Sequence, residues 1–415
     1  LLGGSRLAMY PWPPIGENIA RLRLLADLTQ EELVSKAGVS VDLIRRLEQT
    51  SRLTARIQSL YHIANALDVP LSVLLAQPNV LRPSERDGEQ GGVLALRQAL
   101  TPAKNGISPT DEAPEVLSVA ELQRSAQEGW RLYRRGKFSA LAALLPDLIS
   151  AGELATQQLT GQERAAAFTV LADVYQVAAV LVTHLSHDDL GFVAAQKAIT
   201  AADRSDDQNL RAVTVATLSF ILLRQGRLTE AEQVALDKAN ENEPSLVKAT
   251  PVELSVWGML LWMGMTAASR NEKPAQAADL LSLMQAVAHR IGEDRCDYSM
   301  VFGPTSVAMQ AVGLAVERGD SGQALELARQ VPTTGKVPLI TKARHLLDVA
   351  HAQCLENKNA DALTSLREVQ ALTPEWMRYQ VLAREITRAL LTKQGATRSR
   401  LPGLRELATY LGVAG

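Results

Sequence analysis

The feature that most constrains this chain is a regular alternation of helical segments and short turns after residue 118. Polar or glycine-containing turns recur about every 40 to 50 residues, a period typical of helical solenoids. Alanine and leucine dominate the segments between the turns, and both favour helices because they lose little side-chain freedom there. We therefore expect an all-α fold with six or so helical pairs. The turns lie at 134–137, 187–189, 224–227, 270–273, 318–320 and 356–359.

The length of the chain and its glycine and proline pattern predict more than one domain. At 415 residues it exceeds the size at which a single hydrophobic core usually stops growing. Nine glycine and proline residues interrupt 78–118, a composition typical of a linker, and only Val93–Leu100 favours a brief helix there. Such a linker would let the flanking domains change orientation. The expected divisions are 1–14, disordered or added for expression, a first domain over 15–77, the linker over 78–118, and a repeat domain over 119–415.

Charge and cysteine content exclude several classes of protein. The formal net charge of −2 gives no long-range attraction to nucleic acid or to an anionic membrane, so any DNA contact must come from a local patch. Cys296 and Cys354 cannot form a disulfide framework, and we expect both to be small core residues in a reducing compartment. Neither a signal peptide nor an uninterrupted run of ~18 apolar residues is found, so we expect a cytoplasmic protein without membrane contact.

The sequence offers no pattern for catalysis, a cofactor or a metal. It lacks a phosphate-cradling glycine-rich loop, and no Ser-His or Cys-His pair has supporting context. His351 with Cys354, and the histidines near 184–189, do not supply the four ligands of a structural zinc site. We therefore expect a protein that is not an enzyme and holds no metal.

Residues 15–77 have the spacing of five short helices. Thr29 and Glu32 form a capping-box pattern, and Gly38 can take the left-handed conformation that ends a helix. Ser40 then caps the next helix. Two short helices joined through such a turn predict a helix-turn-helix. The expected helices cover 15–25, 30–37, 41–49, 57–67 and 71–75.

Five blocks of this domain agree in order and spacing with a known pattern. They are Leu22-Arg23, Thr29-Gln30-Glu31-Glu32-Leu33, Ala37-Gly38-Val39-Ser40, Ile44-Arg45-Arg46-Leu47-Glu48 and Ile63-Ala64-Asn65-Ala66-Leu67-Asp68-Val69. The domain therefore resembles the phage-repressor type of helix-turn-helix domain. The resemblance implies that the helix over 41–49 lies in the major groove of double-stranded DNA, with Val41, Asp42 and Arg46 near base edges. Arg46 is the strongest candidate for recognising a base, because a guanidinium can bind O6 and N7 of guanine together.

The resemblance also implies roles for the residues around the helix over 41–49. It implies that Gln30 hydrogen-bonds a phosphate at the start of its helix. It pairs Arg23 with Glu48 in an internal salt bridge, and it places Asp27 and Asp68 where glycine usually takes a left-handed turn. The remaining expected DNA contacts are Ser40, Arg45, Arg52 and Arg56, the last two in contact with phosphates or the minor groove.

The repeat domain resembles the tetratricopeptide repeat, in longer and degenerate copies. Stacked pairs of this kind form a superhelix with a concave groove that binds peptides or partner proteins. Trp257 and Trp262, among several methionines, suit an adaptable pocket, although filling the solenoid core is the more common role of such residues. Tyr175, Arg211 and Arg344 are further groove candidates by helix position. A closing helix within Leu401–Val413 would cap the array or contact a second copy.

The joint architecture resembles the peptide-pheromone-responsive regulators of Gram-positive bacteria and orphan actinobacterial regulators of the same build. It implies a homodimer on a palindromic operator, with a peptide or small molecule bound in the repeats, as in quorum sensing. The first hypothesis is therefore a sequence-specific transcription regulator. The alternative is an interaction adaptor whose first domain only tethers, because seven basic residues of that domain are balanced by seven acidic ones.

Overall fold

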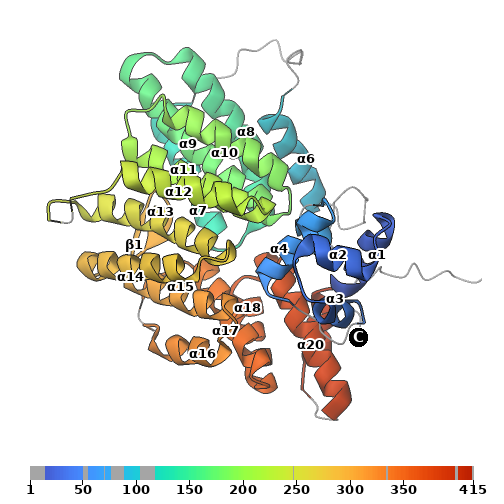
Figure 1. The fold of residues 1–415 in the computed structure, drawn as a ribbon. Coiled ribbons are helices and arrows are strands. Elements are labelled where there is room, and N and C mark those ends of the chain that lie inside the picture. The colour runs from blue at the N-terminus through green and yellow to red at the C-terminus, as the bar shows by residue number, and fades with distance from the viewer. Residues whose placement is uncertain are drawn as a thin grey trace, which may run out of the picture.

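The computed structural model describes residues 15–49, 55–69, 71–75, 88–102, 117–245, 247–332, 335–397 and 401–413. Within these ranges the chain is helical except for one two-stranded hairpin (Figure 1). A small N-terminal domain lies against one edge of a larger, curved array of helical pairs. This confirms the all-α fold, with a five-helix domain joined to a solenoid of the tetratricopeptide type.

The N-terminal domain has the five helices expected from the sequence. Ile19, Ile44 and Ile63 come from three different helices and are fully buried together with Leu33 and Leu47. Both Asp27 and Asp68 take the left-handed turn, with φ of 51° and 52°. The helices are α1 (Ile15–Leu25), α2 (Gln30–Ala37), α3 (Val41–Glu48), α4 (Ile57–Ala66) and α5 (Leu71–Leu74).

Six helical pairs form the solenoid, and the turn within each pair lies where the sequence pattern predicted it. Capping boxes at Ser118 with Glu121 and at Thr250 with Glu253 begin two of the first helices. The pairs are α7 (Val119–Arg134) with α8 (Phe138–Gln158), α9 (Gly161–His184) with α10 (Asp188–Ala202), α11 (Gln208–Gln225) with α12 (Leu228–Glu241), α13 (Pro251–Arg270) with α14 (Pro274–Ile291), α15 (Pro304–Glu317) with α16 (Ser321–Gln330), and α17 (Leu339–Leu355) with α18 (Asn359–Leu372).

The brief helix expected within the linker is longer than predicted and belongs to the repeat domain. It forms α6 (Gly88–Leu100), which packs on α8 and contacts α10. Leu96 and Leu100 are buried in the same hydrophobic cluster as the first repeats. The leucines of this segment pack against α8 and so join it to the repeat domain. Of the rest of the expected linker, 78–87 and 103–116 lie outside the described residues.

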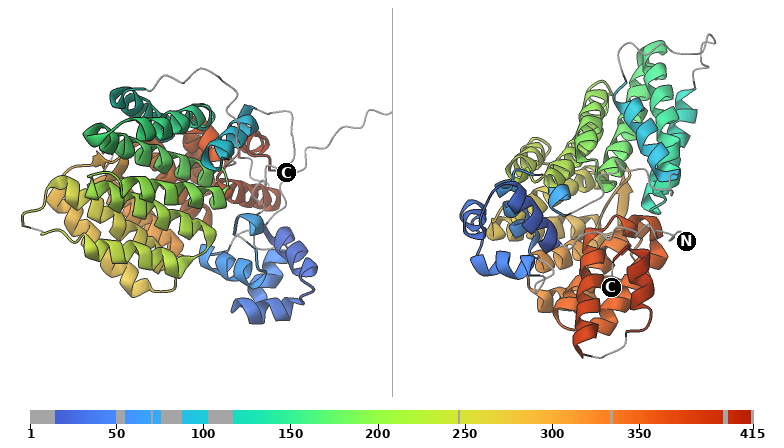
Figure 2. Two further views of the ribbon diagram at one scale, coloured as in Figure 1. Left: turned by 90° about the horizontal axis from the view of Figure 1, so that it is seen from above. Right: turned by 90° about the vertical axis from the view of Figure 1, so that its right-hand side faces the viewer.

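The array curves until its last helices meet its first. After α18 the chain forms α19 (Pro374–Arg378), α20 (Val381–Thr397) and α21 (Leu404–Tyr410), the last within the predicted closing segment. The backbone N–H and hydroxyl of Ser139 donate to a carboxylate oxygen of Glu375 at 2.8 and 2.9 Å. The rings of Phe138 and Tyr379 lie 6.1 Å apart. Buried residues of both ends form one hydrophobic cluster, and the two ends are adjacent in both views of Figure 2.

A β-hairpin that the sequence did not predict joins α14 to α15. Strand β1 (Arg295–Asp297) pairs antiparallel with β2 (Met300–Phe302), and both strands contact α13. The hydroxyl of Tyr298 at its tip donates to the carboxylate of Asp207, at 2.8 and 2.9 Å from its two oxygens, at the start of α11. Cys296 lies 3.8 Å from Nη1 of Arg134 at the end of α7. The hairpin thus reaches across to the first and third helical pairs.

The two cysteines differ in burial. Cys354 is buried as expected, but Cys296 is exposed because it lies on β1, outside the core. The prediction that both cysteines are core residues is therefore wrong for Cys296. In the described part of the chain, two helices, α8 and α9, are long and apolar enough to cross a membrane by length and composition. Both pack inside the helical array, and most of α9 is buried against its neighbours.

Candidate nucleic-acid interface

The turn between α2 and α3 is held by hydrogen bonds at the beginning of both helices. The Thr29 hydroxyl accepts from the Glu32 backbone N–H at 3.2 Å, and a Glu32 carboxylate oxygen accepts from the Thr29 N–H at 2.7 Å. These bonds from Thr29 lower the pKa of Glu32. Gly38 ends α2 with φ of 63°, and the Ser40 hydroxyl accepts from the Leu43 N–H at 3.2 Å. Ser40, an expected DNA contact, therefore has a structural role in fixing where α3 begins.

Helix α3 has one buried and one exposed face. Leu43, Ile44 and Leu47 pack into the domain core. Asp42, Arg45 and Arg46 point to solvent, and Val41 is partly buried. Amphipathic spacing alone produces this division, since residues three and four apart share a face of a helix. The structure therefore brings the expected base-reading residues together on one open helical surface.

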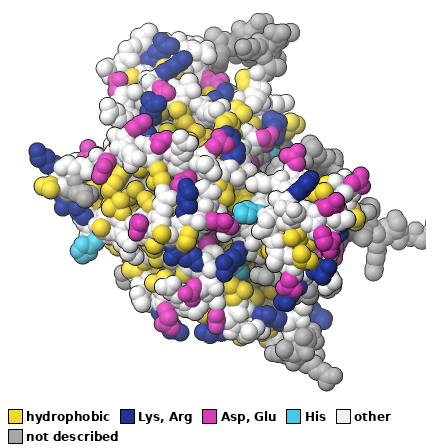
Figure 3. Space-filling view, in the orientation of Figure 1, with side chains coloured by type: hydrophobic (Ala, Val, Ile, Leu, Met, Phe, Trp, Pro, Cys, Tyr) yellow, Lys and Arg dark blue, Asp and Glu magenta, His cyan; other side chains and the backbone are white. Residues whose placement is uncertain are grey.

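The exposed arginines of α3 are paired with carboxylates of their own domain. Arg46 Nε lies 2.8 Å from Asp42 Oδ1 one helical turn away, and Arg45 Nη2 lies 3.2 Å from Glu31 Oε1 on α2. Ion pairs this exposed contribute little to stability and exchange readily for other partners. Acidic and basic side chains alternate over the N-terminal domain on the face shown at the right of Figure 3.

Glu48, the last residue of α3, joins this helix to α1 and α2 by hydrogen bonds. Arg23 on α1 donates from Nε and Nη2 to its two carboxylate oxygens, both at 2.8 Å, which confirms the predicted internal salt bridge. Gln30 Nε2 donates to Glu48 Oε2 at 2.7 Å, so the expected phosphate ligand is held inside the domain in this structure. Burial would raise the pKa of Glu48, but the bonds from Arg23 and Gln30 hold it below its usual range.

The two remaining arginines of the expected DNA set lie beyond α3. Arg52 falls outside the described residues. Arg56 is exposed at the start of α4, and its guanidinium lies over Gly319 of the repeat domain, where an added Cβ would be 2.8 Å from Nη2. Arg56 therefore lies at the border of the two domains.

That border is a packed seam between α4 and the turns of the solenoid. Tyr61 of α4 is 2% exposed, and its hydroxyl donates to the Leu223 carbonyl near the end of α11. Its ring lies over Gly226, where an added Cβ would be 2.9 Å from Cδ1. Buried residues of the N-terminal domain and of α11 to α15 belong to one hydrophobic cluster. The seam thus fixes the N-terminal domain on the repeats through the side of α4, while the polar face of α3 stays exposed.

A nearly buried ion pair lies beneath the seam. Arg270 at the end of α13 contacts Glu317 at the end of α15 at 2.7 Å. Burial would lower the pKa of Arg270, but the carboxylate of Glu317 and the hydroxyl of Tyr61 raise it. Removing one partner of such a pair leaves an uncompensated charge, which is strongly destabilising. The sequence pattern did not predict the contacts of Tyr61, Arg270 and Glu317. The local sign of them was Tyr61 itself, an aromatic residue beside the apolar stripe of α4.

Replacing Gly226 with alanine should loosen this seam. The residue ends α11 with φ of 81°, and the new Cβ would press on the Tyr61 ring. Gly292→Ala is a matched control, because Gly292 ends α14 with φ of 76° and an added Cβ would lie 4.0 Å from the His289 carbonyl oxygen. Both variants should lose about 1 to 2 kcal/mol of stability from the left-handed conformation. Hydrogen exchange should show faster exchange in α4 for Gly226→Ala alone, and equal exchange in both variants would contradict the described seam.

Of the five residues expected in a ligand groove, two are core residues. Tyr175 is 4% exposed, and its hydroxyl donates to Glu153 of α8. Trp257 is also 4% exposed, and its indole N–H donates to the Ala239 carbonyl at 3.0 Å. Both side chains fill the space between neighbouring helices, so they offer almost no surface to a ligand. This agrees with the core role that the sequence left open for Trp257.

The other three groove candidates are partly accessible. Arg211 pairs with Asp203 at 3.0 Å and Arg344 with Asp348 at 3.0 Å, and about half of each arginine side chain is exposed. Trp262 is partly buried on α13. They come from different helical pairs and share no hydrogen bond. Among the described residues, no group of three or more His, Cys, Asp or Glu side chains could hold a metal ion.

Comparison with known proteins gives only distant structural similarity. No family model and no curated protein matches the chain. PilF of Pseudomonas aeruginosa is 17% identical, over 63% of this chain and 98% of its own, with a TM-score of 0.32. PlcR of Bacillus thuringiensis, solved with the peptide PapR7 and DNA, is 10% identical over 93% and 99%, with a TM-score of 0.27. ComR from S. thermophilus, solved with DNA and its signalling peptide ComS, is 13% identical over 91% and 99%, with a TM-score of 0.26.

The described residues define a class by architecture: an all-helical protein in which a helix-turn-helix domain is seated on the edge of a tetratricopeptide-like solenoid.

Proposed function

We propose that the chain is a cytoplasmic, sequence-specific DNA-binding regulator of transcription that is not an enzyme. The observation that carries the proposal is α3, a capped helix whose exposed face presents Val41, Asp42, Arg45 and Arg46 while its other face is fixed in the core. A helix of this kind fits the major groove, which is wide enough to admit it. Arg45 and Arg46 can exchange their exposed carboxylate partners for phosphate or base acceptors.

The repeat domain would receive the signal and form the dimer. The packed seam at Tyr61 supports this part of the proposal, because it couples the position of α3 to the turns of the third, fourth and fifth helical pairs. A homodimer would present two copies of α3 about 34 to 36 Å apart, or a multiple of that, to a palindromic operator. A peptide or a small molecule that shifts those turns would change this spacing.

Selection of sheared genomic DNA by the purified full chain, at low and at physiological salt, tests the proposal. We expect a palindromic motif to be enriched, with an affinity that falls steeply as salt rises because phosphate neutralisation releases counterions. Recovery of no motif at either salt would favour an interaction adaptor over a regulator.

Arg46→Ala should weaken binding to the selected operator by about 1 to 3 kcal/mol and relax specificity at one base pair. The physical reason is the loss of a bidentate contact to guanine. Fluorescence anisotropy with the operator and with single-base variants of it measures both effects. Arg124→Ala is the control, because Arg124 is exposed on α7 of the repeat domain. An equal loss for Arg46→Ala on every DNA sequence would assign Arg46 to a phosphate.

A further inference from the structure

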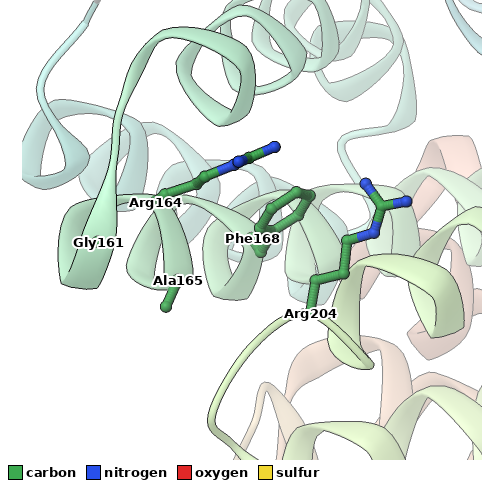
Figure 4. A pocket seen from close by; sticks show the side chains of 5 residues that line it. All are labelled: Gly161, Arg164, Ala165, Phe168 and Arg204. Carbon is green, nitrogen blue, oxygen red and sulfur yellow. The ribbon is translucent and has the colours of Figure 1, made fainter.

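An open hollow of about 480 Å³ lies at the junction of α8, α9 and α10, away from the seam. Its walls are Gly161, Arg164, Ala165, Phe168 and Arg204. Figure 4 shows the Phe168 ring standing between the two arginine side chains, which come from α9 and from the loop after α10. The sequence analysis singled out none of these residues.

The two arginines are positioned by the ring between them. The guanidinium carbons of Arg164 and Arg204 lie 5.7 and 5.4 Å from the centroid of Phe168, within cation–π range. Phe168 is 8% exposed, so the ring itself is held in the core. Arg164 Nε donates to the Thr156 carbonyl at 2.9 Å, which further limits its movement. Both exposed guanidinium groups therefore contact the same buried ring.

Neither arginine forms an ion pair with a carboxylate in the described part of the chain. Asp203, the neighbour of Arg204 in the sequence, is engaged by Arg211 at 3.0 Å. Gly161 opens α9, and its N-cap Thr160 makes no side-chain capping bond. The first turn also has the exposed carboxylate of Glu163, which is not part of the walls of the hollow. The hollow thus has two guanidinium groups and no acidic residue among its walls.

The geometry points to a binding site for a phosphate monoester. Two guanidinium groups are matched by a group with close to two negative charges, and a phosphate monoester has about −1.5 to −2 at pH 7 with three acceptor oxygens. A carboxylate has one charge and two oxygens, and it would leave one arginine without a partner. Arginine forks bind phosphate oxygens in bidentate geometry, and the remaining volume is open to the organic part of the ligand.

The site lies far from the proposed DNA contact. Helix α9 extends from Gly161 at the hollow to His184, which contacts Phe220 of α11 near the seam end of the array. At 1.5 Å per residue, α9 is roughly 35 Å long, so the hollow lies about that far from the contact of His184 with α11. The phosphate site does not rest on DNA binding, and either proposal can fail without the other.

Isothermal titration of the full chain with inorganic phosphate, at pH 7.5 and constant ionic strength, tests the site. We expect saturable binding that Arg204→Gln weakens at least tenfold, since a charge-assisted hydrogen-bond pair is lost. Arg164→Gln should act alike, and Arg204→Gln remains informative if loss of the Thr156 bond unfolds the other variant. Arg124→Gln, an exposed arginine without a ring partner, should bind as the native chain does.

Further arms of the experiment identify the source of the phosphate. Stronger binding of glucose 6-phosphate than of inorganic phosphate would favour a free metabolite, and stronger binding of a phosphoserine peptide would favour a modified protein. Both results support a monoester site. No saturable binding to the native chain, or equal binding by the native chain and Arg204→Gln, would overturn the proposal. Competition by duplex DNA would also overturn it, because the arginines would then serve the DNA backbone.

Discussion

Gly16→Ala is expected to unfold the N-terminal domain and with it to abolish the proposed DNA binding. Gly16 is buried in α1, and an added Cβ would lie 1.7 Å from the backbone carbonyl oxygen of Leu47 in α3. A backbone atom cannot turn aside as a side chain can, so α1 and α3 would have to separate. We expect a loss of about 3 kcal/mol or more, a large share of the stability of so small a domain. Thermal unfolding followed by circular dichroism should show an early transition, with the repeats melting later.

Gly38→Ala is the matched control for this substitution. Gly38 has φ of 63°, but no atom lies within 4 Å of an added Cβ. The left-handed conformation costs an alanine about 1 to 2 kcal/mol, and no clash adds to it. Gly38→Ala should therefore keep the domain folded and bound to DNA at 25 °C. Similar melting of the two variants would mean that α1 and α3 are not packed as described.

Asp173→Asn is expected to stabilise the repeat domain above pH 7. Trp130 donates from its indole N–H to Asp173 Oδ1 at 2.6 Å between α7 and α9. Burial raises the pKa of Asp173 to about 7, although Trp130 and Arg134 act in the opposite direction. An asparagine keeps an acceptor oxygen for Trp130 and has no charge to bury. At pH 8 the gain should be about 2 to 4 kcal/mol, since each unit of pKa shift is worth about 1.4 kcal/mol.

The size of this effect depends on pH. The folded chain holds the Asp173 proton up to pH 7, whereas the unfolded chain releases it near pH 4, so the folded state binds more protons in between. The native chain should therefore lose stability from this group as pH rises from 4 to 7, and the variant should not. At pH 4 the two proteins should unfold at nearly the same urea concentration. A variant less stable than the native chain at pH 8 would show that the carboxylate is favourably paired.

The elements that could be predicted from the sequence are those that depend on neighbours along the chain. Thr29 with Glu32, Gly38 and Ser40 give local capping and turn signals, and these located α2 and α3 to within a residue. The six solenoid turns were predictable for the same reason. The Arg23–Glu48 salt bridge was predictable through the resemblance to the phage-repressor domains.

The contacts that could not be predicted join segments far apart in the sequence. Tyr61 follows Leu60 by one residue, about 100° around α4, so its burial depends on a surface 162 residues away. The three-residue strands of the hairpin are too short for an alternating pattern to be recognised. The Phe168 hollow depends on two cations 40 residues apart, one from α9 and one from the loop after α10. In each case the contact depends on a distant segment of the chain, and the local sequence pattern does not identify that segment.

The contact of Ser139 with Glu375 alters how the solenoid should unfold. In an open array each repeat touches only its neighbours, so unfolding can spread from either end and shortened versions remain folded. Here the first and last helices bury one another, and neither end is free to fray. Deletion of α19 to α21 would expose Phe138 and its neighbours on the first pair. The repeat domain should therefore melt as a single cooperative unit, and truncation from the C-terminus should destabilise the N-terminal repeats first.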